Sequence, residues 1–218
     1  TGSTAYALHF ASTVAGAVSI SGGSFTQTTT ALYAIYFQGA VTGTGVSISD
    51  ATVTAADSAI VISDLQAPLA LTNVVSTATS GNGLALSSIA AAATSIAITG
   101  GSFTGADRGM ILQAVPSATA ITLTGVTVSA TGTTNAALQF ASTVAGPVSI
   151  TGGTFTQNDA AKNGVVFQGA ITGTGVSITD ATVSSGRTAI LLADVQAPVA
   201  LNNVVATAAT AGYHAVSF

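Results

Sequence analysis

A long stretch of the chain is repeated almost verbatim, and this constrains its fold more than any other feature. The segment ASTVAGAVSISGGSFTQ at residues 11–27 returns as ASTVAGPVSITGGTFTQ at residues 141–157. A second segment, QGAVTGTGVSISDATV, begins at Gln38 and returns from Gln168 as QGAITGTGVSITDATV. Internal repetition is the mark of a solenoid, whose repeats stack on one another and share a continuous core. We expect a single domain over residues 1–218, in which residues 5–88 match residues 135–218.

Each copy is built from shorter units of about 23 to 28 residues, a period typical of solenoids. The units are marked by two apolar residues separated by one residue, a spacing that places both side chains on one face of a β-strand. These pairs are Val18/Ile20, Val46/Ile48, Leu69/Leu71, Ile96/Ile98, Ile121/Leu123, Val148/Ile150, Val176/Ile178 and Val199/Leu201. A similar pair stands seven to ten residues before each of them: Leu8/Phe10, Ile35/Phe37, Ile60/Ile62, Leu84/Leu86, Met110/Leu112, Leu138/Phe140, Val165/Phe167 and Ile190/Leu192.

A third apolar position follows in most units. It holds Phe25, Val53, Phe103, Val128, Phe155 and Val183, and in the third and eighth units Ser76 and Ala206. The sequence therefore predicts three strands per unit, about eight units, and a ninth first strand with His214 and Val216 facing inward.

Between the second and third strands, one position is restricted to three residue types. Only Gly, Asp or Asn occupies it, at Gly22, Asp50, Asn73, Gly100, Gly125, Gly152, Asp180 and Asn203. These residues tolerate left-handed backbone angles that other L-residues resist. We predict a sharp bend with positive φ at each of these eight turn positions.

Composition points to an all-β protein without a nucleic-acid or membrane partner. Thr and Val favour strands, and charged residues make up only 5% of the chain. Three basic residues are too few to contact a phosphate backbone along a groove. Ser, Thr or Gly interrupts every apolar run before it reaches the ~18 residues of a membrane span. The absence of Cys, with a single Lys and abundant Thr and Ser, favours an extracellular location.

With three strands per unit and a bend restricted to Gly, Asp or Asn, the sequence resembles the right-handed parallel β-helix. The near-verbatim copies, rich in Gly, Thr, Ser and Ala, are most similar to bacterial autotransporter passengers and surface adhesins. That resemblance implies a bacterial cell-surface protein. Pectin-degrading enzymes and phage tailspikes share the fold, so the architecture alone does not assign a function.

The carboxylates give no sign of an active site. Asp50 and Asp180 occupy turn positions, where Asp is a common turn residue. Asp64 and Asp194 are expected to lie level with Gly39, Ser88 and Gly169 in adjacent units, so no second carboxylate is expected beside either. We therefore expect no catalytic, cofactor-binding or metal-binding residues, and no enzymatic activity.

The outward positions of the third strand are hydroxyl residues in six of eight units. The threonines of this face are Thr26, Thr52, Thr54, Thr104, Thr127, Thr154, Thr156 and Thr182. The pattern resembles the Thr arrays of β-helical antifreeze proteins, which implies binding to ice. Alternatively, Thr is simply a favourable polar residue in strands. Val75 and Val205 interrupt the array in the third and eighth units.

The outward positions of the first strand are mostly apolar. A candidate contact stripe is formed by Tyr36, Val61, Ile111, Val166 and Leu191. Contiguous exposed apolar surface marks a contact site, although the chain's own loops could instead cover the stripe. Because the sequence shows no cap at either end of the coil, we also expect the rod to continue, through more sequence or stacked copies, or the stripe to be buried against a neighbouring chain.

From these observations the sequence predicts a non-enzymatic structural shaft of a bacterial cell-surface adhesin, or a self-assembling extracellular filament. Its expected partners are further copies of itself, in axial or lateral contact. The alternative is an ice- or glycan-binding β-helix that uses the Thr/Ser face. A carbohydrate-active enzyme ranks third.

Overall fold

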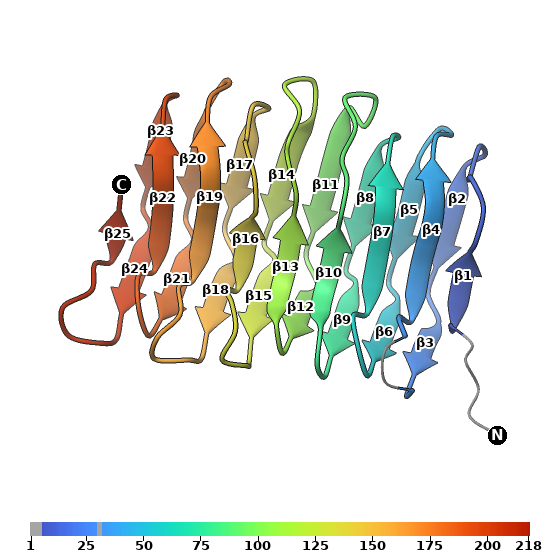
Figure 1. The fold of residues 1–218 in the computed structure, drawn as a ribbon, viewed down its shortest axis with the longest axis horizontal. Helices are drawn as coiled ribbons and strands as arrows, with labels where there is room; N and C mark the ends of the chain where they lie inside the picture. The colour runs from blue at the N-terminus through green and yellow to red at the C-terminus, as the bar shows by residue number, and fades with distance from the viewer. Residues whose placement is uncertain (1–5, 30–31) are drawn as a thin grey trace.

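The chain is a parallel β-helix with three strands per rung. A computed structural model describes residues 6–29 and 32–218. Figure 1 shows a rod in which successive rungs follow one another along the long axis, from the N-terminal to the C-terminal end. Within the described residues every regular element is a strand, and the strands form three parallel sheets of about eight turns. Ala5, where the first copy of the repeat begins, lies outside the described residues.

The first sheet has the order β1-β4-β7-β10-β13-β16-β19-β22-β25. Its strands are Leu8–Phe10 (β1), Ile35–Val41 (β4), Ile60–Leu65 (β7), Asn82–Leu86 (β10), Arg108–Leu112 (β13), Leu138–Phe140 (β16), Val165–Ile171 (β19), Ile190–Val195 (β22) and Val216–Ser217 (β25). Those of the second sheet are Val18–Ser21 (β2), Val46–Ser49 (β5), Leu69–Thr72 (β8), Ser95–Thr99 (β11), Ala120–Thr124 (β14), Val148–Thr151 (β17), Val176–Thr179 (β20) and Val199–Asn202 (β23). The third sheet contains Ser24–Gln27 (β3), Thr52–Ala55 (β6), Val75–Ala78 (β9), Ser102–Gly105 (β12), Thr127–Ala130 (β15), Thr154–Gln157 (β18), Thr182–Ser185 (β21) and Val205–Ala208 (β24).

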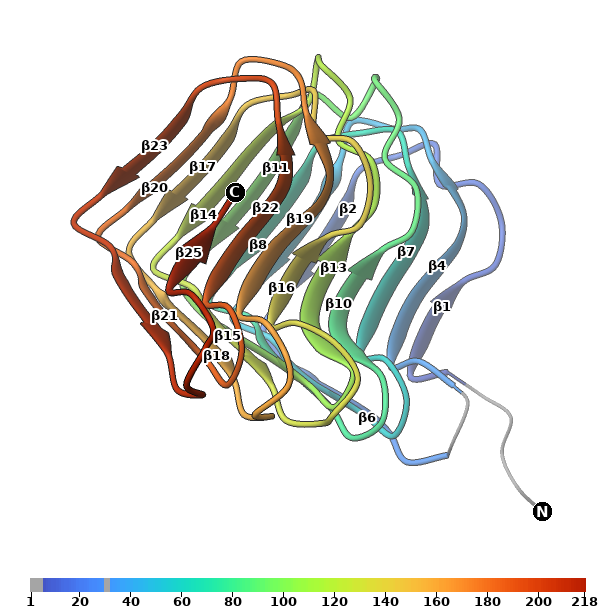
Figure 2. The ribbon, with the colours of Figure 1, turned by 60° about the vertical axis from the view of Figure 1, so that its left-hand side comes forward.

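The strand register matches the alignment predicted from the apolar pairs. In the second sheet Val18 lies opposite Val46, and in the third sheet Phe103 lies opposite Val128. Each strand from β1 to β9 has a counterpart in the second copy of the repeat, from β16 to β24. Figure 2 shows the three sheets as the walls of one coil. The repeat in sequence is therefore a repeat in structure.

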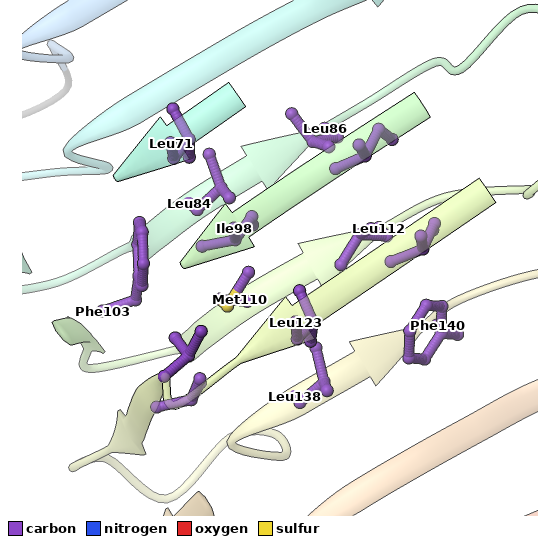
Figure 3. Packing of buried hydrophobic residues seen from close by; sticks show 14 of the residues in the cluster. Leu71, Leu84, Leu86, Ile98, Phe103, Met110, Leu112, Leu123, Leu138 and Phe140 are labelled. Atoms are coloured by element: carbon purple, nitrogen blue, oxygen red, sulfur yellow. The ribbon is translucent and has the colours of Figure 1, made fainter. Parts of the chain in front are cut away.

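The inward side chains stack on like side chains in the next rung. Phe10 stacks on Phe37, and Phe140 on Phe167, each pair with ring centroids 4.4 Å apart and planes 8° from parallel. Figure 3 shows the interior of the middle rungs, where Leu86, Leu112 and Phe140 follow one another, as do Leu84, Met110 and Leu138. Burying one such side chain stabilises the fold by about 1.5–3 kcal/mol. Because the ladder repeats this gain in every rung, the core extends along the rod without a break.

Ser76 is one of the polar residues that the core accommodates. Ser76 takes the inward position of the third rung and is fully buried. Its hydroxyl donates a hydrogen bond to the carbonyl oxygen of Gly83 over 2.6 Å. Satisfying the buried hydroxyl in this way removes the cost of placing it in an apolar core.

The bend between the second and third sheets has positive φ in all eight rungs, as predicted. The angles are 69° at Gly22, 53° at Asp50, 53° at Asn73, 62° at Gly100, 61° at Gly125, 67° at Gly152, 55° at Asp180 and 50° at Asn203. Where Asp and Asn are neighbours, their side chains also bond to each other. Asn73 Nδ2 donates to Asp50 Oδ1 over 3.2 Å, and Asn203 Nδ2 donates to Asp180 Oδ1 over 2.7 Å.

The prediction for the ninth first strand was wrong by two residues. Val216, and not His214, pairs with Ile190, and Ser217 pairs with Leu191. His214 and Tyr213 are both exposed. The longer connection leaves the imidazole in solvent and places an apolar residue over Ile190, which avoids the cost of burying a polar ring without a partner.

We predict that Gly100→Val lowers the free energy of unfolding by at least about 1–2 kcal/mol, because a Val side chain is strained at positive φ. In addition, a Cβ at Gly100 would lie 2.6 Å from Asn73 Oδ1. Gly125→Val separates these causes, because Gly125 has the same positive φ but no heavy atom within 4 Å of an added Cβ. Gly16→Val is the control without either cause.

Denaturant unfolding measures all three variants. We expect the largest loss for Gly100→Val, a smaller loss for Gly125→Val and little change for Gly16→Val. Equal stability of the three proteins would show that the bend imposes no conformational demand.

Candidate functional site

Within residues 6–29 and 32–218, neither Asp64 nor Asp194 lies opposite another carboxylate in the first sheet. A β-bulge between Phe37 and Ala40 places Ala40, rather than Gly39, opposite Asp64. The same irregularity places Ala170, rather than Gly169, opposite Asp194. The expected neighbours Gly39 and Gly169 were therefore wrong by one residue, because counting along the strand does not reveal the extra residue of a bulge. The bridge between Leu65 and Ile89 keeps Ser88 level with Asp64, as expected.

Each of the two carboxylates accepts a hydrogen bond from the glutamine two residues further along the chain. Gln66 Nε2 donates to Asp64 Oδ2 over 2.7 Å, and Gln196 Nε2 donates to Asp194 Oδ2 over 2.9 Å. In residues 6–29 and 32–218 no three His, Asp, Glu or Cys side chains come close enough to hold a metal ion. The described part of the chain also has no helix long and apolar enough to cross a membrane.

The Thr/Ser face lies on the outer side of the third sheet, as two parallel columns of side chains. Thr52, Thr127, Thr154 and Thr182 belong to the first column, which Val75 and Val205 interrupt. These four threonines are exposed. Thr26, Thr54, Thr104 and Thr156 belong to the second column, in which Thr26 is exposed and the other three are half-buried.

The second column has a hydroxyl in every rung. Its members in order are Thr26, Thr54, Thr77, Thr104, Ser129, Thr156, Ser184 and Thr207. The third and eighth rungs thus break only one of the two columns. Aligning the first and the second outward position of each strand separately would have shown in the sequence that the second column is unbroken.

The candidate contact stripe runs along the outer face of the first sheet, but it is less exposed than expected. Val61 is 6% and Val166 7% exposed, and Tyr36, Ile111 and Leu191 are half-buried. The Tyr36 ring extends from β4 towards β7, where its hydroxyl lies 3.4 Å from the hydroxyl of Ser63, two residues beyond Val61. The stripe is therefore not an open apolar surface.

An aromatic cluster occupies the N-terminal end of this outer face. It consists of Tyr6, His9, Tyr33 and Tyr36, with neighbouring ring centroids between 4.3 and 6.2 Å apart. His9 stacks on Tyr36 with ring planes 3° apart, and its Nε2 lies 2.9 Å from Gln38 Oε1. Burial raises the pKa of the Tyr33 hydroxyl, and the nearby Asp57 carboxylate raises it further. The cluster joins the first two rungs on the outside.

A groove with cationic walls lies at the other end of the same face. Three connections from the third sheet to the first, β15–β16, β18–β19 and β21–β22, lie side by side there, as Figure 1 shows. The groove has a volume of about 260 Å³. Its lining includes Lys162 and Arg187 from the connections, with Gln139, Val166 and Leu191 from the sheet. We call it the cationic groove.

The remaining cation, Arg108, is held beside the groove by a polar network. Its guanidinium forms an ion pair with Asp107 and donates from Nε to Gln139 Oε1. Gln139 Nε2 in turn donates to Gln168 Oε1 over 2.6 Å. Burial lowers the pKa of Arg108, and the Asp107 carboxylate partly opposes that shift. The network fixes the two glutamine amides that line the groove.

Sequence reasoning missed this groove, because Arg108, Lys162 and Arg187 lie far apart in the chain. The groove could have been predicted from the position of each cation relative to the inward residues of the first sheet. Lys162 stands three residues before the inward Val165, and Arg187 stands three residues before the inward Ile190, which pair in adjacent strands. Equal offsets from paired residues place the two cations in adjacent rungs.

Comparisons of this chain with models of protein families, with curated proteins and with solved structures gave no match.

Proposed function

We propose that this chain is a non-enzymatic structural shaft of a bacterial cell-surface protein. The observation that carries the proposal is that the same strand register, including its β-bulge, occurs in both copies of the repeat. Inward apolar residues and bend residues recur from rung to rung, and both serve to build a rod. The ionisable residues do not recur in this way: the charged groove occupies one stretch of three rungs.

The surface location rests on composition and on the resemblance of the repeats to bacterial surface proteins. A chain with 5% charged residues and no Cys suits an oxidising exterior, where a free thiol would be a liability. Near-verbatim repeats suit a shaft, because adding copies changes length without changing the core. Assembly into a filament is the other form that the same rod could take.

Duplication of the repeat tests the proposal that the rod acts as a modular spacer. A chain in which residues 1–140 are followed by residues 11–218 contains residues 11–140 twice and gains five rungs. At about 4.8 Å per rung, the folded rod should lengthen by about 24 Å. Small-angle scattering and electron microscopy measure the length.

The matched control joins residue 130 to residue 11, so that β15 is kept and the first strand β16 is lost at the junction. We expect it to misfold or to form two separate bodies. Antibodies against the rod should also label intact source cells. A duplicated chain that is not extended, or labelling only after the cells are permeabilised, would contradict the shaft.

The unbroken hydroxyl column favours a second candidate function, binding to ice. Eight hydroxyl residues at one per rung form a regular row on the third sheet. Their spacing of about 4.8 Å is fixed by the backbone and therefore needs no ordering when ice binds.

If this face binds ice, replacing Thr54, Thr104 and Thr156 together with Tyr should abolish thermal hysteresis without changing the circular dichroism spectrum. The matched control replaces Thr72, Thr99 and Thr151, exposed threonines of the second sheet, with Tyr. It should retain the activity. Absence of hysteresis and of ice shaping in the unaltered protein would end this proposal.

A further inference from the structure

We propose that the cationic groove binds a sugar residue that carries a carboxylate. This recognition site is separate from the structural role of the rod. Its position is set by three neighbouring connections, and all three cations of the chain lie in it or beside it.

Two like charges stand in adjacent rungs at this site. The Arg187 backbone N–H donates to the Lys162 carbonyl oxygen over 2.9 Å, so the two residues are neighbours along the rod. Two like charges on neighbouring residues repel each other. In the part of the chain that the structure describes, Arg108 and Asp107 form the only ion pair, so neither Lys162 nor Arg187 is paired with a carboxylate there.

The nearby carboxylates are engaged elsewhere. Asp107 accepts hydrogen bonds from Thr134 and Asn135 as well as from Arg108. Asp159 Oδ1 accepts the backbone N–H of Ala161 over 2.8 Å. Two positive charges without an ion-pair partner in the described residues therefore face one groove, in a chain whose net charge is −4. A scaffold gains nothing from this arrangement, whereas an anionic ligand would be stabilised by it.

The rest of the lining suits a sugar rather than a bare anion. The amides of Asn135, Gln139, Asn163 and Gln168 offer donors and acceptors for hydroxyl groups. Val166 and Leu191 provide an apolar floor for the less polar face of a sugar ring. The volume of about 260 Å³ is below the range of about 300–1,000 Å³ found for drug-sized ligands, so we assign the groove one sugar residue.

Arg187 is also held in place without a carboxylate partner. The centre of its guanidinium group lies 5.3 Å from the centroid of the Tyr213 ring, a cation–π distance. This contact positions the charge while leaving the guanidinium edge available for a carboxylate, which it can bind through two hydrogen bonds.

Titration of the isotopically labelled protein with glucuronate, followed by nuclear magnetic resonance, tests the proposal. We expect saturable shifts in the amides of residues 161–168 and 187–191, and much weaker shifts with glucose, its neutral counterpart. Lys162→Gln combined with Arg187→Gln should weaken glucuronate binding by at least about tenfold, because two charge-assisted hydrogen bonds are lost.

The charge-matched control is Ser19→Asp combined with Thr99→Asp, two exposed positions of the second sheet. Both double variants change the formal net charge from −4 to −6. The control should bind glucuronate nearly as well as the unaltered protein. Equal losses in the two double variants would mean general electrostatic attraction and would overturn the site. Equal affinity for glucose, or for sodium sulfate, would overturn its assignment to an acidic sugar.

Stability gives a readout that does not depend on the ligand. Lys162→Gln alone should raise the thermal midpoint slightly, because it removes one of two like charges on neighbouring residues. A lower midpoint would mean that Lys162 serves the fold, and the proposal would then fail.

Discussion

The structure depends on hydrogen bonding in register between successive rungs, and this bonding continues through the bend. The backbone N–H of Asp50, at the bend, donates to the Thr72 carbonyl of the next rung over 2.9 Å. Two residues later, the N–H of Thr52 donates to the Gly23 carbonyl of the previous rung over 2.9 Å. Positive φ at the bend turns the chain between two sheets while its polar groups remain paired. Without that angle, the bend would interrupt the hydrogen bonding between rungs.

The register divides the molecule into an inside that is constrained and an outside that is not. Most inward positions present apolar side chains to the rungs above and below, as Phe140 does to Phe167. Outward positions need only hold residues that are compatible with the β-strand conformation. The three outer surfaces therefore differ. The third sheet carries hydroxyl columns, and the first sheet carries an aromatic cluster at one end and the cationic groove at the other.

The sequence predicted the rungs because their causes are local. An apolar pair on one strand face and a Gly, Asp or Asn at the bend each act within a few residues, so periodicity reveals them. The ninth first strand was misplaced because His214/Val216 and Val216/Phe218 have the same spacing, and only the cost of burying an imidazole distinguishes them. The exposure of the stripe could not be predicted because it depends on where the Tyr36 ring lies. The groove depends on three connections that meet only when the rungs are stacked.

Disulfide formation between engineered cysteines tests the register most directly, because the chain has no Cys of its own. Ala97 and Thr122 are paired in adjacent rungs and both are exposed. Their Cα atoms should be about 4.8 Å apart, within the range that a disulfide spans. Ala97→Cys with Thr122→Cys should therefore form an intramolecular disulfide on mild oxidation. Ala97→Cys with Thr124→Cys, about 8 Å apart, should not. The opposite result, with the second pair linked and the first free, would contradict the register.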